Sequence, residues 1–369
     1  MKFTDYNIIV LKLGSALLID SKNNNFRVKW LQDLACNIAK LRNLGIKVLI
    51  VCSGAIASAS LKLGKNKQEL SLDELQAYAA YGQALLIGEM QKIFSKQQIE
   101  LAQILITNDD CQNRRRYLNM RATIRKLLEM DIVPIINEND TISTEEIKFG
   151  DNDVLAARVV ALSEADLLIL LSDIEGLYDS NPKENKGAKL IKEIKQIDHK
   201  ILALASSKTN IYGTGGMKSK IQAAKIANGF GADMIITKGA GKNPLLALEQ
   251  QKLYSIFSAK NLKLSSRKKW LSGLKIKGEV VVNKGAEEAL SKGGASLLPV
   301  GVSEVKGEFC RGDMILIINS LGNKIAQGLS GLDSTEIEIY KGKNSKEISE
   351  LTNNLTRLYL VHYDDMLLT

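Results

Sequence analysis

The sequence predicts an α/β fold with a mainly parallel central sheet, followed by a small C-terminal β-barrel domain. Over the first 240 residues, short β-rich runs alternate with longer amphipathic segments, which is typical of an α/β protein. Several of the runs are apolar at consecutive positions, as expected for strands that are covered on both faces. After about Ala259 the pattern changes to short strands separated by glycine turns, which favours a small barrel.

Strands and helices of the first part follow from these patterns. Six runs are expected to be strands: Asn7–Gly14, Lys47–Gly54, Leu101–Thr107, Ile132–Asp140, Asp166–Asp173 and Ala232–Gly239. Four segments between them are expected to be helices: Val28–Asn43, Leu72–Gln98, Tyr117–Met130 and Asn152–Leu162. We therefore place a first domain at 1–259, a polar and basic linker at 260–272, and the barrel domain at 273–369.

Composition excludes several classes of protein. The net charge of +9 is spread along the chain, and the part from Lys260 onward has a surplus of only 3 positive charges, so a polyanion partner is not required. The four cysteines and two histidines lie far apart and indicate neither a disulfide framework nor a zinc site. No signal peptide or membrane span is apparent. We expect a cytoplasmic protein with reduced thiols.

Polar residues follow the first two strands, where ligands bind in open α/β sheets. LKLGS places Lys12 and Ser15 after the first strand, and CSGA places Ser53 and Gly54 after the second. Either motif alone is more typical of a plain strand-to-helix turn. Both together in one sheet favour a shared anion site at helix N-termini.

Three carboxylates are concentrated in the segments NEND and KFGDND, namely Asp140, Asp151 and Asp153, together with Asn137 and Asn152. Asp and Asn are ordinary turn and N-cap residues, but a cap needs only one of them. The density favours a site that binds an ammonium group or orders cationic side chains.

Two further segments are candidates for nucleotide contacts. SDIEGLYDSNP, from Ser172 to Pro182, fits either a surface loop or the edge of a nucleotide site, against which a base and ribose pack. NIYGTGGMKSKIQAAKIA, from Asn210 to Ala227, sets three glycines before a helix but does not match the usual phosphate-loop pattern. One face of that helix is expected to be mostly buried, which would leave Lys218 and Lys220 freer to reach outward.

The most basic local run is NRRRYLNMRATIRK, from Asn113 to Lys126. Aromatic residues among arginines can bind nucleic acid. A buried stripe of Tyr117, Leu118, Ala122 and Leu128, with the arginines facing solvent or another subunit, is the favoured interpretation.

Taken together and in order, the motifs resemble those of glutamate 5-kinases in the amino acid kinase family. The motifs are LKLGS, SGAIA, YLNMRATIRKLLE, VPIINENDTIS, EIKFGDND, SDIEGLY and TGGMKSKIQAA. The tail resembles the PUA domain of many such enzymes, through RKKWLSG, the turn NKGAEEAL, SLLPVGVSEVKGEFCRGD and AQGLS. The resemblance covers nearly the whole chain and implies a three-layer sandwich with helices on both sides of the sheet.

This resemblance also implies a reaction, the transfer of the ATP γ-phosphoryl group to the side-chain carboxylate of L-glutamate with Mg²⁺ present. The product, L-glutamyl 5-phosphate, leads to proline. Such a transfer needs positioning and charge compensation rather than a general base, because the attacking carboxylate is already ionised. The family further implies feedback inhibition by proline and a homo-oligomer.

Site residues implied by the resemblance fall into three groups. Catalysis is assigned to Lys12, Lys220 and Asp153, where Asp153 holds both lysines. Glutamate binding is assigned to Ser53, Asp140 and Asn152. ATP binding is assigned to Lys12, Ser172, Asp173, Thr214, Gly215, Gly216, Met217, Lys218, Ser219 and Lys220, and no protein ligand is assigned to Mg²⁺.

Some departures and rival hypotheses stay open at this point. Ser172 stands where threonine is usual, Cys52 where serine is common, and Ser58–Ser60 replaces a more glycine-rich turn. An amino acid kinase that acts on aspartate, N-acetylglutamate, carbamate or UMP would share the sheet and the two lysines. An RNA-binding PUA protein is the rival from another class, and it rests on fold analogy alone.

Overall fold

The computed structural model describes residues 1–20, 23–65, 67–142, 151–180, 182, 184–185, 187–206, 216–251, 253–259, 271, 273–352 and 359–368. The chain forms two compact units, Met1–Lys263 and Leu264–Thr369. Of the linker predicted at 260–272, only residue 271 lies in the described part, so its boundaries stay a prediction.

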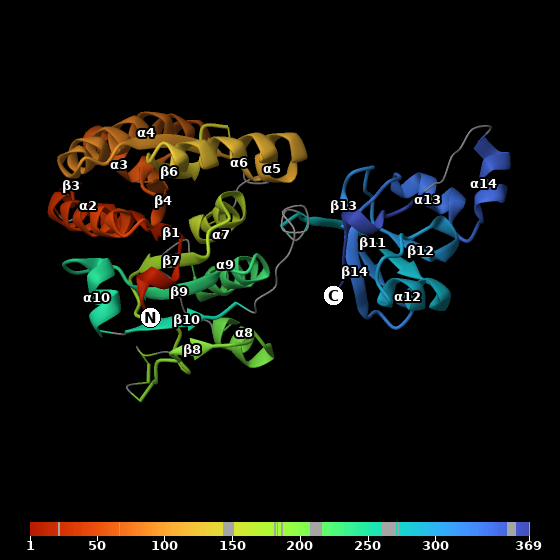
Figure 1. The fold of residues 1–369 in the computed structure, drawn as a ribbon. Helices are drawn as coiled ribbons and strands as arrows, with labels where there is room; N and C mark the ends of the chain where they lie inside the picture. The colour runs from red at the N-terminus through yellow and green to blue at the C-terminus, as the bar shows by residue number, and fades with distance from the viewer. Residues whose placement is uncertain are drawn as a thin grey trace. The chain divides into compact units, whose positions relative to one another are not determined.

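An eight-stranded sheet in the order β5-β6-β4-β1-β7-β9-β10-β8 forms the centre of the first unit (Figure 1). Its strands are β1 (Ile8–Leu13), β4 (Lys47–Cys52), β5 (Leu101–Ile106), β6 (Val133–Glu138), β7 (Leu167–Ser172), β8 (Glu193–Ile194), β9 (Asp233–Lys238) and β10 (Tyr254–Phe257). All neighbouring pairs are parallel except β9 and β10. The predicted mainly parallel sheet is confirmed, and β10 adds an antiparallel strand that the sequence patterns did not indicate.

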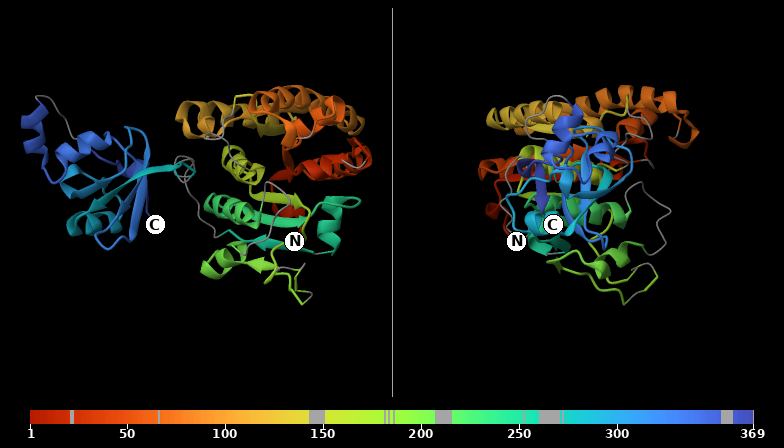
Figure 2. Two further views of the ribbon diagram at one scale, coloured as in Figure 1. Left: turned by 180° about the vertical axis from the view of Figure 1, so that it is seen from behind. Right: turned by 90° about the vertical axis from the view of Figure 1, so that its right-hand side faces the viewer.

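Helices cover both faces of this sheet (Figures 1 and 2). One face carries α2 (Val28–Asn43), α4 (Leu72–Phe94) and α10 (Pro244–Gln251), and the other carries α6 (Arg114–Glu129), α7 (Asn152–Ser163) and α9 (Met217–Gly229). Further helices of this unit are α1 (Ser15–Leu18), α3 (Ala55–Leu63), α5 (Asn108–Gln112) and α8 (His199–Ser206). A small hairpin, β2 (Ile19–Asp20) with β3 (Asn25–Phe26), follows α1.

Alternation along the central strands sorts side chains between the two helical layers. In β1, Ile9, Leu11 and Leu13 are fully buried in a core shared with residues of α2 and α4. Because neighbouring residues of a strand point to opposite faces, Lys12 points to the layer of α7 and α9. This placement decides where the lysine can act.

The second unit contains a five-stranded sheet in the order β12-β11-β13-β14-β15. Its strands are β11 (Ile276–Val282), β12 (Val302–Lys306), β13 (Met314–Ile318), β14 (Lys324–Leu329) and β15 (Met366–Leu368), and its helices are α12 (Lys284–Ser291), α13 (Ser334–Tyr340) and α14 (Ser345–Thr352). The segment NKGAEEAL, expected to be a turn, forms α12 instead. The side chain of Asn283 caps this helix by accepting a hydrogen bond from Ala286 N–H at 2.9 Å.

Candidate active site

Two lysines and one aspartate meet at the edge of the sheet where β1 ends. Lys12 Nζ lies 2.7 Å from Asp153 Oδ1, and Lys220 Nζ lies 2.8 Å from Asp153 Oδ2. Asp153 stands in the first turn of α7, and Lys220 stands in the first turn of α9. The exposed fractions of Lys12, Asp153 and Lys220 are 9%, 0% and 6%. Three charged groups are therefore buried together with one net positive charge.

The two lysines keep the Asp153 carboxylate ionised. Burial alone would raise the pKa of Asp153, but the charges of Lys12 and Lys220, and their hydrogen bonds, outweigh burial and lower the pKa below its ordinary value. Each lysine is held on a separate carboxylate oxygen. The lysine ammonium groups are thus fixed in position while retaining the capacity to attract a further anion.

A second contact ties the starts of α7 and α9 together. Asp151 Oδ1 accepts a hydrogen bond from Asp153 N–H at 3.0 Å and so caps α7. The other carboxylate oxygen of Asp151 accepts a short hydrogen bond from the Ser219 hydroxyl. Of the two lysines expected to reach outward, Lys218 is exposed and Lys220 is buried, because Lys220 turns inward to Asp153.

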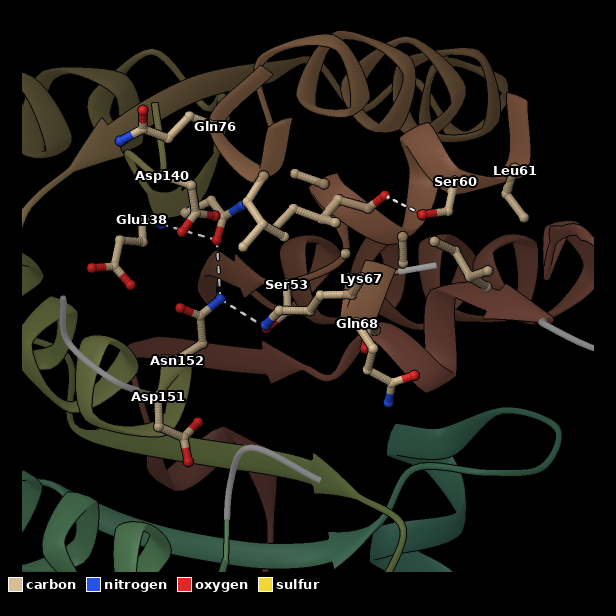
Figure 3. Close-up of a pocket in the computed structure, with 18 of the residues that line it drawn as sticks. Ser53, Ser60, Leu61, Lys67, Gln68, Gln76, Glu138, Asp140, Asp151 and Asn152 are labelled. Carbon is tan, nitrogen blue, oxygen red and sulfur yellow. Dashed lines mark hydrogen bonds between the residues drawn. The ribbon is translucent and has the colours of Figure 1, made fainter. Parts of the chain in front are cut away.

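A cavity of about 720 Å³ lies beside the end of β4 and the start of α7. Ser53, Asp140 and Asn152, the three residues proposed for glutamate, all line it (Figure 3). Asn137 and Glu138 at the end of β6 line it as well. The volume is in the range of small-molecule sites.

Asn152 connects three walls of this cavity. Its Nδ2 lies 2.8 Å from Ser53 Oγ, 3.1 Å from the Cys52 carbonyl oxygen and 3.0 Å from Asn137 Oδ1. Asn137 Nδ2 donates in turn to Gln83 Oε1 of α4 at 3.0 Å. The orientation of the Asn152 amide is therefore set by acceptors that come from separate elements.

The start of α3 forms one wall of the cavity through Gly54, Ala55 and Ile56. Gly54 precedes the helix with a φ of 112°, a conformation that favours glycine. Behind this wall, α4 approaches so closely that a Cβ on Gly82 would lie 1.8 Å from the Ala55 carbonyl oxygen. A glycine at position 82 is thus what allows the α3 wall to pack against α4.

The residues proposed for ATP are described in part. Ser172 lies at the end of β7 opposite Lys238 of β9, and its hydroxyl donates to Asp173 Oδ1 at 3.0 Å. Gly216 is the N-cap residue of α9. Thr214 and Gly215 lie outside the described residues, as do the first three residues of KFGDND.

The arginine-rich run forms α6, and three of its arginines have carboxylate partners. Arg116 pairs with Asp110, Arg121 with Glu164, and Arg125 with Glu129. Tyr117 is buried and its hydroxyl donates to the Ala161 carbonyl at 3.2 Å. This packing favours the structural interpretation of the run.

The composition of the buried stripe was predicted wrongly in two places. Leu118 and Ala122 are exposed, whereas Tyr117, Ile124 and Leu128 form the buried face. Tyr117, Ile124 and Leu128 fit one side of a 3.6-residue helix, whereas Leu118 lies about 100° and Ala122 about 140° around the axis from Tyr117.

Gln83 and Lys67 are among the residues of the cavity region that the sequence patterns did not indicate. Gln83 is a buried polar residue in the otherwise apolar middle of α4, and that contrast was an available signal. Lys67 lines the cavity, and nothing in its local sequence separates it from the neighbouring surface lysines.

The cysteines and the other potential metal ligands of the described residues give no second candidate site. None of the four cysteines forms a disulfide, and burial raises the pKa of Cys52 and of Cys111 to about 12. The described residues contain no group of three His, Cys, Asp or Glu side chains arranged to hold a metal ion. Within the described part of the chain, no helix combines the length and apolarity needed to cross a membrane.

Comparison with known proteins gives two matching families. The amino acid kinase family matches residues 7–238, and the PUA domain matches residues 278–352. Curated glutamate 5-kinases of Brucella abortus (strain S19) and Brucella ovis are each 44% identical over 366 residues, covering 99% of this chain and 96% of the relative.

Comparison with solved structures shows a similar fold. The carbamate kinase from Giardia lamblia, solved with AMP-PNP, aligns with a TM-score of 0.51 at 14% identity, covering 70% of this chain and 100% of that one. This likeness concerns the sheet and its helical layers. By full-length sequence similarity, the chain belongs to the amino acid kinase family and, within it, to the glutamate 5-kinases with a PUA domain.

Proposed function

We propose that this protein transfers the γ-phosphoryl group of ATP to the side-chain carboxylate of L-glutamate, giving L-glutamyl 5-phosphate and ADP. The observation that carries the proposal is the pair of buried lysines on Asp153 at the strand edge that also borders the 720 Å³ cavity. The 44% identity to glutamate 5-kinases over nearly the whole chain supports glutamate as the acceptor.

ATP fits the residues present. Two fixed ammonium groups with one net positive charge, next to the N-terminus of α9, suit the phosphate chain. Ser172, Asp173 and the segment Gly216–Lys220 would contact the nucleotide, together with Thr214 and Gly215. Mg²⁺ would neutralise phosphate charge while bound mainly to phosphate oxygens.

The reaction needs no proton transfer. An oxygen of the glutamate side-chain carboxylate forms a new bond to the γ-phosphorus while the bond from that phosphorus to the β,γ-bridging oxygen breaks, and the electron pair leaves with ADP. Lys12 and Lys220 would stabilise the negative charge on the transferring oxygens. Asp153 would act as a positioning residue, because both of its oxygens are occupied by the lysines.

Glutamate would be held on the cavity side. Asp140 is the proposed partner of its α-ammonium group, with Ser53 and Asn152 as hydrogen-bonding neighbours. The Asn152 contacts described above support this role, since its amide is already oriented toward Ser53. The cavity is much larger than a single carboxylate and can enclose a whole amino acid.

We also propose the metabolic setting that family membership suggests. The acyl phosphate product would be reduced in the next step toward proline, and proline would inhibit the enzyme at or near the glutamate site. The enzyme would act as a homo-oligomer. Steady-state rates with and without proline, and light scattering of the purified protein, test these two points.

An acceptor screen tests the main proposal. The purified chain would be assayed for ADP release with ATP, Mg²⁺ and, separately, glutamate, aspartate, N-acetylglutamate, carbamate and UMP. Hydroxylamine in the assay would trap the acyl phosphate as a hydroxamate. We expect turnover with glutamate, and turnover with UMP or aspartate but not glutamate would overturn the proposal.

A further inference from the structure

Lys67 is a cationic residue of the cavity lining that the reaction as proposed does not use. It stands in η2 (Lys67–Glu69), between α3 and α4, and its side chain lines the cavity. Figure 3 shows this side chain extended into the cavity, in the direction of Ser53 and Asn152 in that view. Its ammonium group forms no ion pair with any described residue, in contrast to Lys65, which pairs with Glu74 at 2.7 Å.

Apart from Lys67, the charged residues that line the cavity are acidic. Glu138, Asp140 and Asp151 line the cavity, and Lys67 is the one cation among its described lining residues. The two catalytic lysines lie outside this lining and are paired with Asp153. An anionic group that entered the cavity would therefore meet three carboxylates and a single ammonium group.

L-Glutamate brings two carboxylates and one ammonium group to such a site. Its side-chain carboxylate must face Lys12 and Lys220 to receive the phosphoryl group, and its α-ammonium has Asp140. The α-carboxylate still needs a positive partner, because leaving it beside the acidic wall would be unfavourable. We infer that Lys67 binds the α-carboxylate of the acceptor and so selects an α-amino acid over an amine that lacks this group; the inference rests on the proposed function.

This role makes a specific kinetic claim. The α-carboxylate is remote from the phosphorus and keeps its charge throughout the reaction, so Lys67 binds the ground state and the transition state equally. Uniform binding of this kind lowers KM without raising kcat. Lys67 is thus a specificity-determining residue, distinct from Lys12 and Lys220, whose effect is expected on kcat.

The variants Lys67→Met and Lys67→Arg separate charge from packing. Lys67→Met keeps the length of the side chain and removes the charge, and we expect KM for glutamate to rise about tenfold or more, as for loss of a charged hydrogen bond, with kcat and KM for ATP changed less than about twofold. Lys67→Arg should restore most of the affinity. Lys65→Met is the matched control, since Lys65 lies next to η2 but does not line the cavity.

An acceptor without the α-carboxylate provides the second readout. For 4-aminobutanoate, which is glutamate lacking that group, kcat/KM or, failing turnover, the inhibition constant against glutamate should be the same in the parent enzyme and in Lys67→Met. The preference for glutamate over 4-aminobutanoate should therefore shrink about tenfold in the variant. Thermal unfolding confirms that both variants remain folded.

The possible results distinguish this inference from the proposed function. An active Lys67→Met enzyme with unchanged KM for glutamate, or with an unchanged preference over 4-aminobutanoate, overturns the role of Lys67 while glutamate kinase activity stands. A fall in kcat at constant KM overturns it too. Absence of glutamate phosphorylation by the parent enzyme would overturn the proposed function and this inference with it.

Discussion

Lys220 Nζ and Asp153 Oδ2 lie 2.8 Å apart although the two residues are 67 positions apart in the chain. Asp153 is fully buried, and its second oxygen is occupied by Lys12 at 2.7 Å. The aspartate therefore sets the distance between two ammonium groups that the proposed reaction requires at one phosphoryl group. The stability of the fold and the turnover of the enzyme should therefore both depend on this carboxylate.

Replacing Asp153 by Asn should destabilise the fold and the site together. The change leaves two buried ammonium groups without their carboxylate, for which a loss of about 3–5 kcal/mol in the free energy of unfolding is expected. Because phosphate oxygens can replace the missing negative charge, Mg²⁺–ATP should raise the melting temperature of the variant more than that of the parent protein. Calorimetric scans with and without nucleotide measure both effects, and equal shifts in the two proteins would contradict this account.

The Asp153 carboxylate should also make the stability of the protein depend on pH. The pKa of Asp153 is lower in the folded protein than its ordinary value of 3.8, so its stabilising contribution is complete above about pH 4 and is lost as the pH falls through the folded-state pKa. Urea unfolding of the parent protein and of Asp153→Asn should give a stability difference that is constant near neutral pH and narrows below about pH 4. A difference that stays constant down to pH 3 would argue against the lowered pKa.

The two lysines are expected to act on turnover rather than on glutamate binding. Lys12→Ala and Lys220→Ala should each lower kcat by a factor of about 100 or more, as for loss of one group that stabilises developing charge. KM for glutamate should change little, because neither ammonium group is proposed to bind the ground-state amino acid strongly. Lys225→Ala, an exposed lysine further along α9 and outside the proposed nucleotide segment, is the control for the removal of positive charge. A variant of Lys12 or Lys220 with unchanged kcat and raised KM would refute the assignment.

Asp140 should show the opposite pattern. Its proposed partner, the α-ammonium group of glutamate, does not change charge during the transfer, so Asp140→Ala should raise KM for glutamate by about 10-fold to 100-fold and affect kcat less. Steady-state kinetics over a wide range of glutamate concentrations would show the split. Loss of kcat alone would place Asp140 nearer the reacting atoms than we propose.

Gly82 and Gly88 offer a paired test of the packing behind the cavity. A Cβ at position 82 would meet the Ala55 carbonyl oxygen at 1.8 Å, so Gly82→Ala should force α3 and α4 apart and cost about 1–3 kcal/mol of unfolding free energy. A Cβ at position 88 of the same helix meets nothing within 4 Å, and Gly88→Ala should stabilise by about 0.5–1 kcal/mol. Chemical denaturation compares them directly, and KM for glutamate should rise only in Gly82→Ala because α3 forms a cavity wall.

Local sequence patterns predicted strands correctly where only one structural signal was present. The six expected strands correspond to β1, β4, β5, β6, β7 and β9. The segment at Asn283 shows where signals compete, because Gly285 suggested a turn while Asn283 and the following Ala and Glu residues form a capped helix. A glycine in the first helical turn costs little free energy, and the Asn283 cap stabilises the helix, so the segment is helical. The antiparallel β10 is only four residues long, too short for its periodicity to be read.

The sequence by itself determined the α/β class, the C-terminal change of architecture and the polar residues that follow each strand, because these depend on periodicity and on positions along the chain. Tertiary structure alone decided that Lys220 turns inward to Asp153, that Leu118 faces solvent and that Lys67 enters the cavity. These outcomes depend on how parallel strands pair and how helices cross them. Such contacts join residues far apart in the chain, and local pattern carries no information about their distance.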